Sequence, residues 1–317
     1  MTPPWLWTLD TCPSTNTWAI EQERLCTHGR MIFTRQQTAG RGQWGRQWYS
    51  PPGVLTASLV VDQPTNPYLG CISLGAALAI IYALEDLCPE LTGRLRLKWP
   101  NDIWLQDRKL CGLLIEAIAA QEDRPSRLVI GIGCNCSVDF SQAEHPVSAN
   151  TGSVNGEPIP LKTAISLGDV INKIPDELTL LSQCRHYLLE LISLIQWQQS
   201  KVNQLSTPST TQPSTITPST RTLSPGQPPA GFQRLLAEIN HRDYLRDRPL
   251  QVITPQNHYQ GWGQGIDPWG RLFLRLDSLG LDHNQIITIS SGHIIISSDL
   301  DKLDFKQPWR DFKTRSN

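Results

Sequence analysis

A run of glycines and arginines near the start of the sequence is the first segment whose composition suggests chemistry. The stretch TAGRGQWGRQW, residues 38–48, has glycines at 40, 42 and 45 and arginines at 41 and 46. Glycine lets a backbone approach a ligand closely, and arginine suits a carboxylate or a phosphate. The pattern is neither the P-loop motif nor the dinucleotide-binding fingerprint. The stretch is either an anion-binding loop or a solvated turn whose arginines are incidental.

A second polar segment, residues 98–112, reads KWPNDIWLQDRKLCG. Pro100-Asn-Asp predicts a turn between two strands, and Gln106-Asp-Arg predicts a tight hairpin. Lys109 would then begin a buried strand and meet a ligand above the sheet, while Gly112 would leave room for that ligand. The alternative is that Lys109 is an exposed lysine on an edge strand.

A third segment, Pro13-Ser-Thr-Asn16, precedes an apolar run. Ser14 or Thr15 is typical of the residue that caps a helix, because its side-chain oxygen accepts from the first backbone amides. The hydroxyl and amide groups of a cap can also bind a small polar ligand. The sequence leaves both interpretations open: a cap alone, or a cap that also contacts a ligand.

Elements that could position these residues alternate along the first two thirds of the chain. Strands are predicted at 31–35, 54–61, 95–99, 109–119 and 127–133. Helices are predicted at 16–26, at 69–87, where the run is apolar enough to be buried, and between 178 and 195, where leucine and isoleucine recur at helical spacing. This mixture predicts an α/β or α+β domain with a substantial sheet.

A segment rich in Pro, Ser and Thr, 206–230, separates this region from the rest of the chain. It holds six of the 24 prolines, and it has too little apolar surface to offset the entropy of ordering, so a mobile or extended tether is predicted. A short helix is predicted at 232–241, followed by strands at 250–254, 259–265, 272–276, 286–290 and 293–296. Short, closely spaced strands are typical of a small β-barrel.

Composition excludes several classes of protein. With 28 basic residues, 29 acidic residues and a net charge of −1, the chain is not typical of general nucleic-acid binders or polybasic membrane proteins. No signal peptide is predicted, and the longest apolar run, around 74–84, is too short to span a bilayer. The eight cysteines are spread thinly, and Cys134-x-Cys136 is not a usual zinc spacing. Free thiols in a reducing compartment, the cytoplasm, are expected.

Together these stretches resemble one family. They are Ser14-Thr15-Asn16, Gln37-Thr-Ala-Gly-Arg-Gly42 with Gly45-Arg46 and Trp48, Ser50-Pro51, Lys98-Trp-Pro-Asn-Asp102, Arg108-Lys109-Leu-x-Gly112, Gly131-Ile-Gly-x-Asn135 and the Gly-Ile-Asp267 turn. In order and spacing they closely resemble biotin–protein ligases, above all in KWPND followed by RKLxG. The resemblance covers nearly the whole chain apart from the Pro/Ser/Thr-rich segment.

The resemblance implies an α+β fold of the class II aminoacyl-tRNA-synthetase-like, biotin–lipoate ligase type, with a mixed sheet and helices. It also implies a small C-terminal SH3-like β-barrel. The expected domains are a catalytic biotin- and ATP-binding domain at 1–205, the flexible insertion at 206–230, a connecting helix at 231–249, the barrel at 250–300 and a tail at 301–317. Because the Ser14 motif begins almost at once, a short form without an N-terminal DNA-binding domain and without repressor function is expected.

The implied activity has two steps. Biotin is activated with ATP to biotinyl-5′-adenylate with release of pyrophosphate, and it is then transferred to one lysine of a biotin carboxyl carrier protein of acetyl-CoA carboxylase. A carboxylate must approach an α-phosphate, so cations and Mg²⁺ are expected to offset the charge. No metal site formed by protein ligands is expected, nor DNA or a membrane as partner. Family members occur as monomers and dimers, which leaves a homodimer open.

The resemblance also assigns roles to residues. Lys109 and Arg41 are the expected catalytic cations. The biotin site would comprise Ser14, Thr15, Asn16, Gln37, Gly40, Arg41, Gly42, Gln43, Lys109, Gly112 and Leu113. The ATP site would comprise Arg41, Arg46, Trp48, Asn101, Asp102, Lys109 and Asn135. The glycine loop would close over the intermediate to exclude water.

One departure from the family pattern concerns the loop. Many members read GRGR, whereas Gln43 stands here in the place of the second arginine and brings no charge. Either Arg41 or Arg46 supplies part of the missing field, or the adenylate is retained less firmly.

Three other functions compete with this interpretation. A lipoate–protein ligase shares the adenylation chemistry, but its RRxxGG-type loop is absent. A non-catalytic biotin-binding protein would not need two cations in the pocket. A nucleic-acid-binding C-terminal barrel is disfavoured by its few basic residues.

Overall fold

The computed structural model describes residues 2–63, 68–121, 125–140, 153–154, 157–158, 164–205, 228–277 and 285–296. The chain divides into two compact units, residues 1–244 with 268–270, and residues 245–267 with 271–317. The expected tether, apart from 228–230, and the expected tail lie outside the described residues. The helix that was expected to connect two domains belongs to the first unit.

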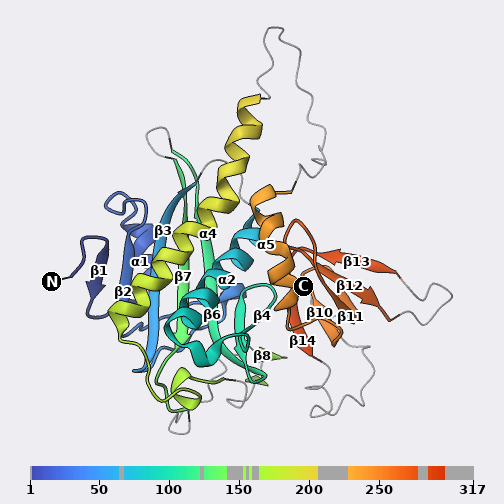
Figure 1. The fold of residues 1–317 in the computed structure, drawn as a ribbon, viewed down its shortest axis with the longest axis horizontal. Coiled ribbons are helices and arrows are strands. Elements are labelled where there is room, and N and C mark those ends of the chain that lie inside the picture. Colours follow the sequence, from blue (N-terminus) through green and yellow to red (C-terminus); the bar gives the residue numbers. More distant parts are fainter. Residues whose placement is uncertain are drawn as a thin grey trace, which may run out of the picture. The chain divides into compact units, whose positions relative to one another are not determined.

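The first unit is built on a seven-stranded mixed sheet in the order β1-β2-β3-β7-β6-β5-β4 (Figure 1). Its strands are β1 (Leu6–Leu9), β2 (Met31–Thr34), β3 (Val54–Gln63), β4 (Arg96–Lys98), β5 (Asp102–Leu105), β6 (Arg108–Ile118) and β7 (Ser126–Asn135). Strands β1 and β2 are parallel, and the other neighbours are antiparallel. A two-stranded ribbon, β8 (Ser153–Val154) with β9 (Glu157–Pro158), lies outside this sheet.

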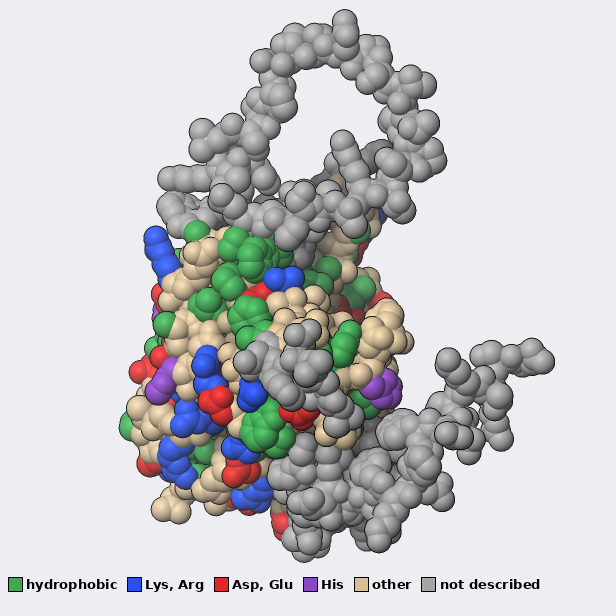
Figure 2. All heavy atoms as spheres, turned by 90° about the vertical axis from the view of Figure 1, so that its right-hand side faces the viewer, with side chains coloured by type: hydrophobic (Ala, Val, Ile, Leu, Met, Phe, Trp, Pro, Cys, Tyr) green, Lys and Arg blue, Asp and Glu red, His purple; other side chains and the backbone are tan. Residues whose placement is uncertain are grey.

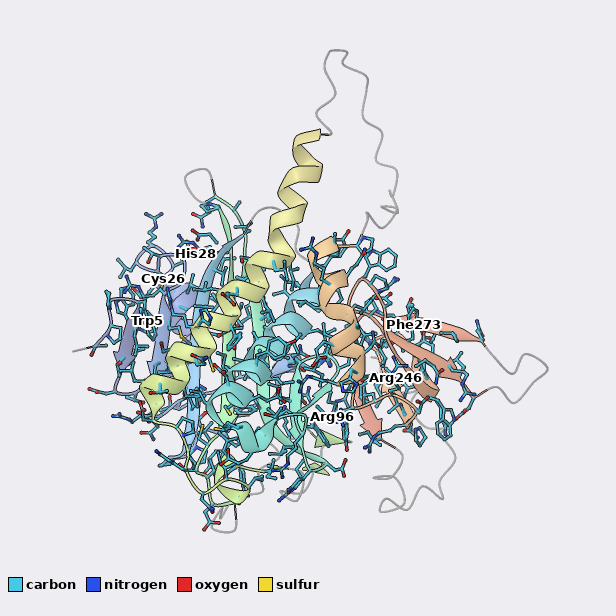
Figure 3. The ribbon with its side chains drawn as sticks, viewed as in Figure 1. Trp5, Cys26, His28, Arg96, Arg246 and Phe273 are labelled. Carbon is cyan, nitrogen blue, oxygen red and sulfur yellow. The ribbon has the colours of Figure 1, made fainter. Side chains whose placement is uncertain are left out.

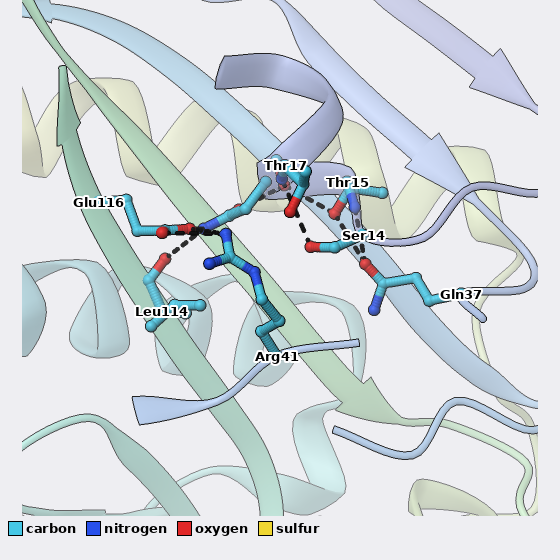
Figure 4. Close-up of polar contacts among 9 residues, drawn as sticks. Ser14, Thr15, Thr17, Gln37, Arg41, Leu114 and Glu116 are labelled. Atoms are coloured by element: carbon cyan, nitrogen blue, oxygen red, sulfur yellow. Dashed lines mark hydrogen bonds and ion pairs between the residues drawn. The ribbon is translucent and has the colours of Figure 1, made fainter. Parts of the chain in front are cut away.

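Four α-helices among the described residues belong to the same unit. They are α1 (Thr15–Glu21), α2 (Leu69–Leu87), α4 (Glu177–Leu205) and α5 (Ala230–His241). Helices α2 and α4 pack on each other and lie on one side of the sheet, whereas α1 lies on the other side (Figures 1 and 4). Short 3-10 turns occur at Gln43–Gly45, Pro89–Leu91 and Leu167–Asp169.

The α1 side of the sheet is built by strand alternation. Side chains two residues apart on a strand share a face, and Val60 of β3 and Val129 of β7 join Ala19 of α1 in one buried cluster. Helix α1 is capped by Ser14, whose side chain accepts from the backbone of Thr17. The start of α1 is therefore fixed against the middle of the sheet.

The edge of the sheet at β1 carries aromatic side chains. Trp5, which comes directly before β1, is labelled in Figure 3. Arg185 of α4 lies 5.1 Å from the centre of the Trp5 ring, and Trp7 packs edge-on against Trp18. These contacts join β1 and its flanking residues to α1 through Trp18 and to α4 through Arg185.

The second unit is a five-stranded antiparallel sheet in the order β13-β12-β11-β10-β14. Its strands are β10 (Pro249–Ile253), β11 (His258–Ile266), β12 (Leu272–Leu276), β13 (Ile286–Ile289) and β14 (His293–Ile296). Asp267 is buried and accepts hydrogen bonds from the backbone and the guanidinium of Arg271. The Gly-Ile-Asp267 motif thus closes the β11–β12 connection, and the sheet is compatible with the expected SH3-like domain.

The predicted elements are confirmed, most of them with small shifts of their ends, but α4 continues to Leu205, about ten residues beyond the predicted helix. Helix α2 and strands β12 and β14 have the bounds expected from the sequence, whereas α1 ends at Glu21 instead of Cys26. Residues 22–25 form a turn. Strand β1 and the ribbon of β8 and β9 were not predicted.

Two chain-wide expectations can be compared with the structure. Helix α2 is long and apolar enough to cross a membrane, but 72% of its most apolar window is buried inside the protein, as in a core helix. All eight cysteines are free and buried. On the face shown in Figure 2, basic and acidic side chains are interspersed.

Candidate active site

A pocket on the α1 side of the sheet brings the predicted residues together. Its lining comes from the start of α1 (Ser14, Thr15, Asn16), the glycine-rich loop at 38–48 with Gln37 (Arg41, Gly42, Gln43, Arg46, Trp48), the turn into β5 (Asn101, Asp102), β6 (Lys109, Gly112, Leu113, Leu114) and β7 (Gly131, Ile132, Gly133). Only two predicted site residues, Gly40 and Asn135, are not among these lining residues. Segments about a hundred residues apart in the sequence thus converge on one site.

Lys109 is held in the pocket by a carboxylate. Its Nζ lies 2.8 Å from Oδ1 of Asp102, and both side chains are largely buried, with 16% and 18% exposed. The same Nζ lies 5.4 Å from the centre of the Trp48 ring. A lysine in this setting is a fixed positive charge with little water around it, which strengthens its field. It is not a solvated lysine on an edge strand, because β6 lies between β5 and β7.

Asn101 fixes the turn that carries Asp102. Its side-chain amide donates to the carbonyl of Leu113, and its own carbonyl accepts from the Leu113 amide at 3.0 Å. The turn is thereby joined to β6 at two points. Asp102 is held where it can reach Lys109.

The floor of the pocket consists of glycines beneath Trp48. Gly112 of β6 and Gly133 of β7 are direct partners in the sheet. A Cβ at Gly133 would lie 2.3 Å from the Trp48 ring, and one at Gly112 would lie 3.0 Å from it. Trp48 is 7% exposed, and its indole nitrogen has no hydrogen-bond partner among the described residues. Absent side chains on β6 and β7 are what let this ring reach the sheet.

A hydrogen-bonded cluster forms the wall near α1 (Figure 4). Gln37 Oε1 accepts from the backbone of Thr15 at 2.7 Å, and Ser58 Oγ lies 2.7 Å from Thr15 Oγ1 and 2.6 Å from Asn16 Oδ1. Because an amide oxygen only accepts, the single proton of Ser58 goes to Asn16, and the Thr15 hydroxyl can donate to Ser58 or, at 3.3 Å, to Gln37 Oε1. Thr15 Oγ1 keeps accepting capacity.

Both the nitrogen and the oxygen of the Asn16 side-chain amide form hydrogen bonds within the protein. Its Nδ2 donates to the carbonyl of Leu114 at 3.1 Å and to Glu116 Oε2 at 2.8 Å, while its Oδ1 accepts from Ser58. A Cβ at Gly131 would lie 2.5 Å from that oxygen. The Asn16 amide therefore braces α1 against the sheet.

The glycine-rich loop is a closed hairpin. Trp48 donates from its amide to the carbonyl of Gly40 at 2.8 Å, and Gly42 donates to the carbonyl of Arg46 at 2.7 Å. Near the tip, the Arg46 side chain donates to the carbonyl of Gln43 at 3.1 Å, and Trp44 has a φ of 62°, in the left-handed region. Arg41 leaves the hairpin and contacts Glu116 with Nη2 at 2.9 and 3.0 Å.

Gly40 and Asn135 act behind the pocket wall. A Cβ at Gly40 would lie 2.3 Å from the Trp48 carbonyl oxygen, so this position needs glycine for the close approach of the two arms of the loop. Asn135 is buried and its amide donates to the carbonyls of Lys109 and Ile165. It ties the strand of Lys109 to residue 165.

Sequence reasoning missed Ser58, Glu116 and the glycines of β7 as parts of the site. Alternation contained the signal for Glu116, because Gly112, Leu114 and Glu116 are two residues apart on β6 and share a face. Ser58 and Gly131 could be placed only with the register of the sheet, which pairs them directly.

The pocket has few side chains that could bind a metal ion, so it suits a Mg²⁺ ion that is bound mainly by the phosphates of a nucleotide. No group of three or more His, Cys, Asp and Glu side chains in the described ranges is placed to hold a metal ion. Mg²⁺ commonly uses one or two carboxylates together with substrate phosphates. Asp102 and the amide of Asn101 fit that limited role.

Comparison with known proteins agrees with this geometry. Residues 9–135 match the Biotin/lipoate A/B protein ligase family. The biotin--[acetyl-CoA-carboxylase] ligase of Paracoccus denitrificans is 33% identical over 147 residues, which are 45% of this chain and 60% of that protein. The bifunctional ligase/repressor BirA of Escherichia coli is 34% identical over 127 residues, 39% of this chain and 38% of that protein. The match thus spans less than two thirds of either relative.

The fold extends the likeness beyond the matched region. The biotin protein ligase from Aquifex aeolicus in complex with biotin and ATP has a TM-score of 0.64 at 20% identity, covering 92% of this chain and 97% of that chain. At this identity the likeness shows the fold. The family match contains the start of α1, the glycine-rich loop and strands β2 to β7 with the whole pocket lining. Over residues 9–135, about two fifths of its length, the chain is similar to the Biotin/lipoate A/B protein ligase family.

Proposed function

We propose that the chain is an ATP-dependent biotin–protein ligase. One observation carries the proposal: a buried lysine fixed by Asp102 shares a single pocket with the hydrogen-bonded cluster at the start of α1 and with the arginines of the glycine-rich loop. An adenylating enzyme needs both an anion site and a site for the neutral part of its acid substrate. This pocket offers the two side by side.

In the proposed first step, a carboxylate oxygen of biotin attacks the α-phosphorus of ATP. The bond to the bridging oxygen breaks, pyrophosphate leaves, and a mixed anhydride with AMP forms. Lys109 would hold the carboxylate and an α-phosphate oxygen, stabilising the charge that builds as they approach. Arg41 and Arg46 would bind phosphate oxygens from the loop. Mg²⁺, near Asn101 and Asp102, would offset charge on the triphosphate.

The neutral end of biotin would lie at the α1 end of the pocket. Thr15 Oγ1 retains accepting capacity, and Ser14 and Gln37 offer further polar atoms beside it. Gly40, Asn16 and Asn135 would contribute by supporting the wall, Gly112 and Leu113 by forming the slot. Trp48 would provide a flat surface for the adenine or the biotin tail.

In the proposed second step, the amine of one lysine of a biotin carboxyl carrier protein attacks the anhydride carbonyl, and AMP leaves. The curated name of the Paracoccus relative, an acetyl-CoA-carboxylase ligase, supports a carrier of that enzyme as the partner. The free and buried cysteines support a cytoplasmic location. Whether the chain forms a homodimer is to be measured from its oligomeric state in solution. No DNA-binding role is proposed.

Pyrophosphate release tests the proposal. We expect wild type to release pyrophosphate when biotin and ATP are both present, and Lys109→Ala to lose most of that activity, about a hundredfold or more, as when one charge-stabilising group is removed. Biotin binding, followed by calorimetry, should be partly kept.

Lys98→Ala is the matched control, because Lys98 lies over Trp104 at 4.2 Å and does not line the pocket. Unchanged turnover in Lys109→Ala would contradict the assignment of the catalytic cation. Release with lipoate instead of biotin would favour a lipoate ligase, and binding of biotin without release would favour a non-catalytic protein.

A further inference from the structure

One carboxylate, that of Glu116, joins two parts of the pocket wall. Its Oε2 accepts from Asn16 Nδ2 at 2.8 Å, and both of its oxygens accept from Arg41 Nη2, at 2.9 and 3.0 Å (Figure 4). Asn16 belongs to α1, Arg41 to the glycine-rich loop and Glu116 to β6. The side chains of Arg41 and Glu116 are 45% and 24% exposed. A partly buried carboxylate thus ties three elements at one point.

The contact fixes how Arg41 presents its other donors. Arg41 meets Glu116 through Nη2 alone, and its Nη1 and Nε make no hydrogen bond within the described ranges. A planar guanidinium that is held at one corner points its remaining N–H groups in a fixed direction. An anion can then bind without first ordering a long side chain, which lowers the entropic cost of binding.

The Arg41–Glu116 ion pair also joins the loop to β6, which none of the loop's backbone hydrogen bonds does. Thr38 and Ala39 bond to the carbonyls of Cys12 and Pro13 at the base of the loop, and the remaining loop bonds close the hairpin on itself. The Arg41–Glu116 pair crosses from the hairpin to β6.

We propose that Glu116 is a positioning residue, which anchors the glycine-rich loop to β6 through Arg41 and holds the Asn16 amide at the same time. The anchor depends only on these contacts, whereas its effect on biotin activation rests on the proposed function. Glu116→Gln is the sharp variant, because glutamine is the same size but offers one accepting oxygen and no charge. With its oxygen in the place of Oε2, which accepts from both Asn16 and Arg41, its NH2 group would face Arg41 Nη2 where Oε1 now accepts, and the ion pair would be lost.

Trypsin cleavage after Arg41, mapped by mass spectrometry on the full chain without added biotin or ATP, tests the anchor. We expect Glu116→Gln to raise the initial rate about fivefold, which is the largest shift that an ion pair of this exposure commonly gives. Glu177→Gln is the matched control, because it breaks the exposed pair between Glu177 and Arg35, whose contact is 2.7 Å. It should leave this cleavage unchanged.

Cleavage after Arg127 reports on general loosening, because its guanidinium is bound by Asp62 and by the carbonyls of Glu23 and Cys26. A rise after Arg41 with no rise after Arg127 supports the anchor. An unchanged rate after Arg41, or an equal rise at both sites, overturns it.

Steady-state pyrophosphate release separates the two proposals. We expect Glu116→Gln to raise the KM for ATP about fivefold and to lower kcat at most twofold, because Glu116 orders Arg41, which would bind the phosphate oxygens. A merely structural loss would lower kcat through the amount of folded enzyme without moving KM. An unchanged KM overturns the positioning role. If wild type itself releases no pyrophosphate while cleavage still responds to Glu116→Gln, the proposed function fails and the anchor stands.

Discussion

Trp48 lies against the sheet in the pocket because two neighbouring strands lack side chains beneath it. Its ring approaches the β7 backbone at Gly133 and the β6 backbone at Gly112 so closely that no Cβ fits at Gly133. The same ring faces Lys109. The positions of the ring and of the ammonium group are therefore coupled. A substitution at Gly112 or Gly133 should consequently displace Lys109, the proposed catalytic cation.

Gly133→Ala should displace Trp48 while leaving the sheet intact. The added methyl would lie 2.3 Å from a ring atom, so the ring must move into the space of the ligand, and overpacking of this kind costs about 1–3 kcal/mol. We expect a loss of about tenfold or more in kcat/KM for pyrophosphate release. Thermal unfolding should confirm that the protein still folds.

Gly168→Ala is the matched control for this change, because the nearest atom to its added methyl would be 3.4 Å away, an ordinary contact. Normal activity in Gly133→Ala would show that the ring can move without disturbing Lys109, and that the glycine floor does not set the site.

At the scale of elements, the sequence predicts what is periodic. The buried run at α2 and the apolar strands β3, β6 and β7 stand out because their patterns extend over ten residues or more. Strand β1 is defined by its parallel pairing with β2, which lies 25 residues further along the chain, and the end of α1 depends on the turn at residues 22–25. Local composition cannot decide either.

The site residues also fall into those that the sequence predicts and those that it does not. Lys109, Asp102 and the loop arginines could be named from motifs, because their chemistry is visible in the residue types. Glu116 and Ser58 could not, because their roles arise from strand register and from partners far away in sequence. The same geometry gives Asn16 and Asn135 supporting contacts that a motif alone does not reveal.

Helix α5 is fastened to α2 by one guanidinium. Arg242, which follows α5, contacts Glu85 of α2 at 2.7 and 2.9 Å and also Glu238 of α5. The side chains of Arg242 and Glu85 are both about nine-tenths buried. Removing one member of a buried pair leaves the other charge without compensation.

Arg242→Ala should therefore lower the free energy of unfolding by about 3 kcal/mol or more. Urea denaturation followed by circular dichroism measures the change. Arg35→Ala removes a comparable contact with Glu177 at the surface and should cost less than about 1 kcal/mol. Equal effects of the two variants would mean that burial does not determine the contribution of the Arg242 pair.

At the scale of the whole molecule, the cysteines behave as core residues. All eight are free and buried. Burial raises the pKa of the Cys184 thiol from its ordinary value of 9.0 to about 12. Hydrogen bonding with Cys111 raises the pKa of Cys134, and hydrogen bonding with Cys134 raises that of Cys136. Thiols that remain protonated and out of contact with water react slowly.

Alkylation of Cys184 should consequently report on the folded state. At pH 8 a thiol of pKa 9 is about one-tenth thiolate, whereas one of pKa 12 is about a thousandfold less ionised than that. We expect iodoacetamide to modify Cys184 in urea but not in buffer, as read by mass spectrometry of tryptic peptides. Modification in buffer at the rate seen in urea would show that the α4 side of the sheet opens readily.

The pH dependence of stability follows from the same shift. Since the pKa of Cys184 is higher in the folded state, folding favours the protonated thiol. Its contribution to stability is complete below about pH 9 and is lost as the pH rises from 9 towards 12, where the unfolded chain releases the proton first. Oxidants and alkylating agents that need a thiolate should therefore reach this core mainly through unfolding, so protection of Cys184 and resistance to urea should fall together as the pH is raised.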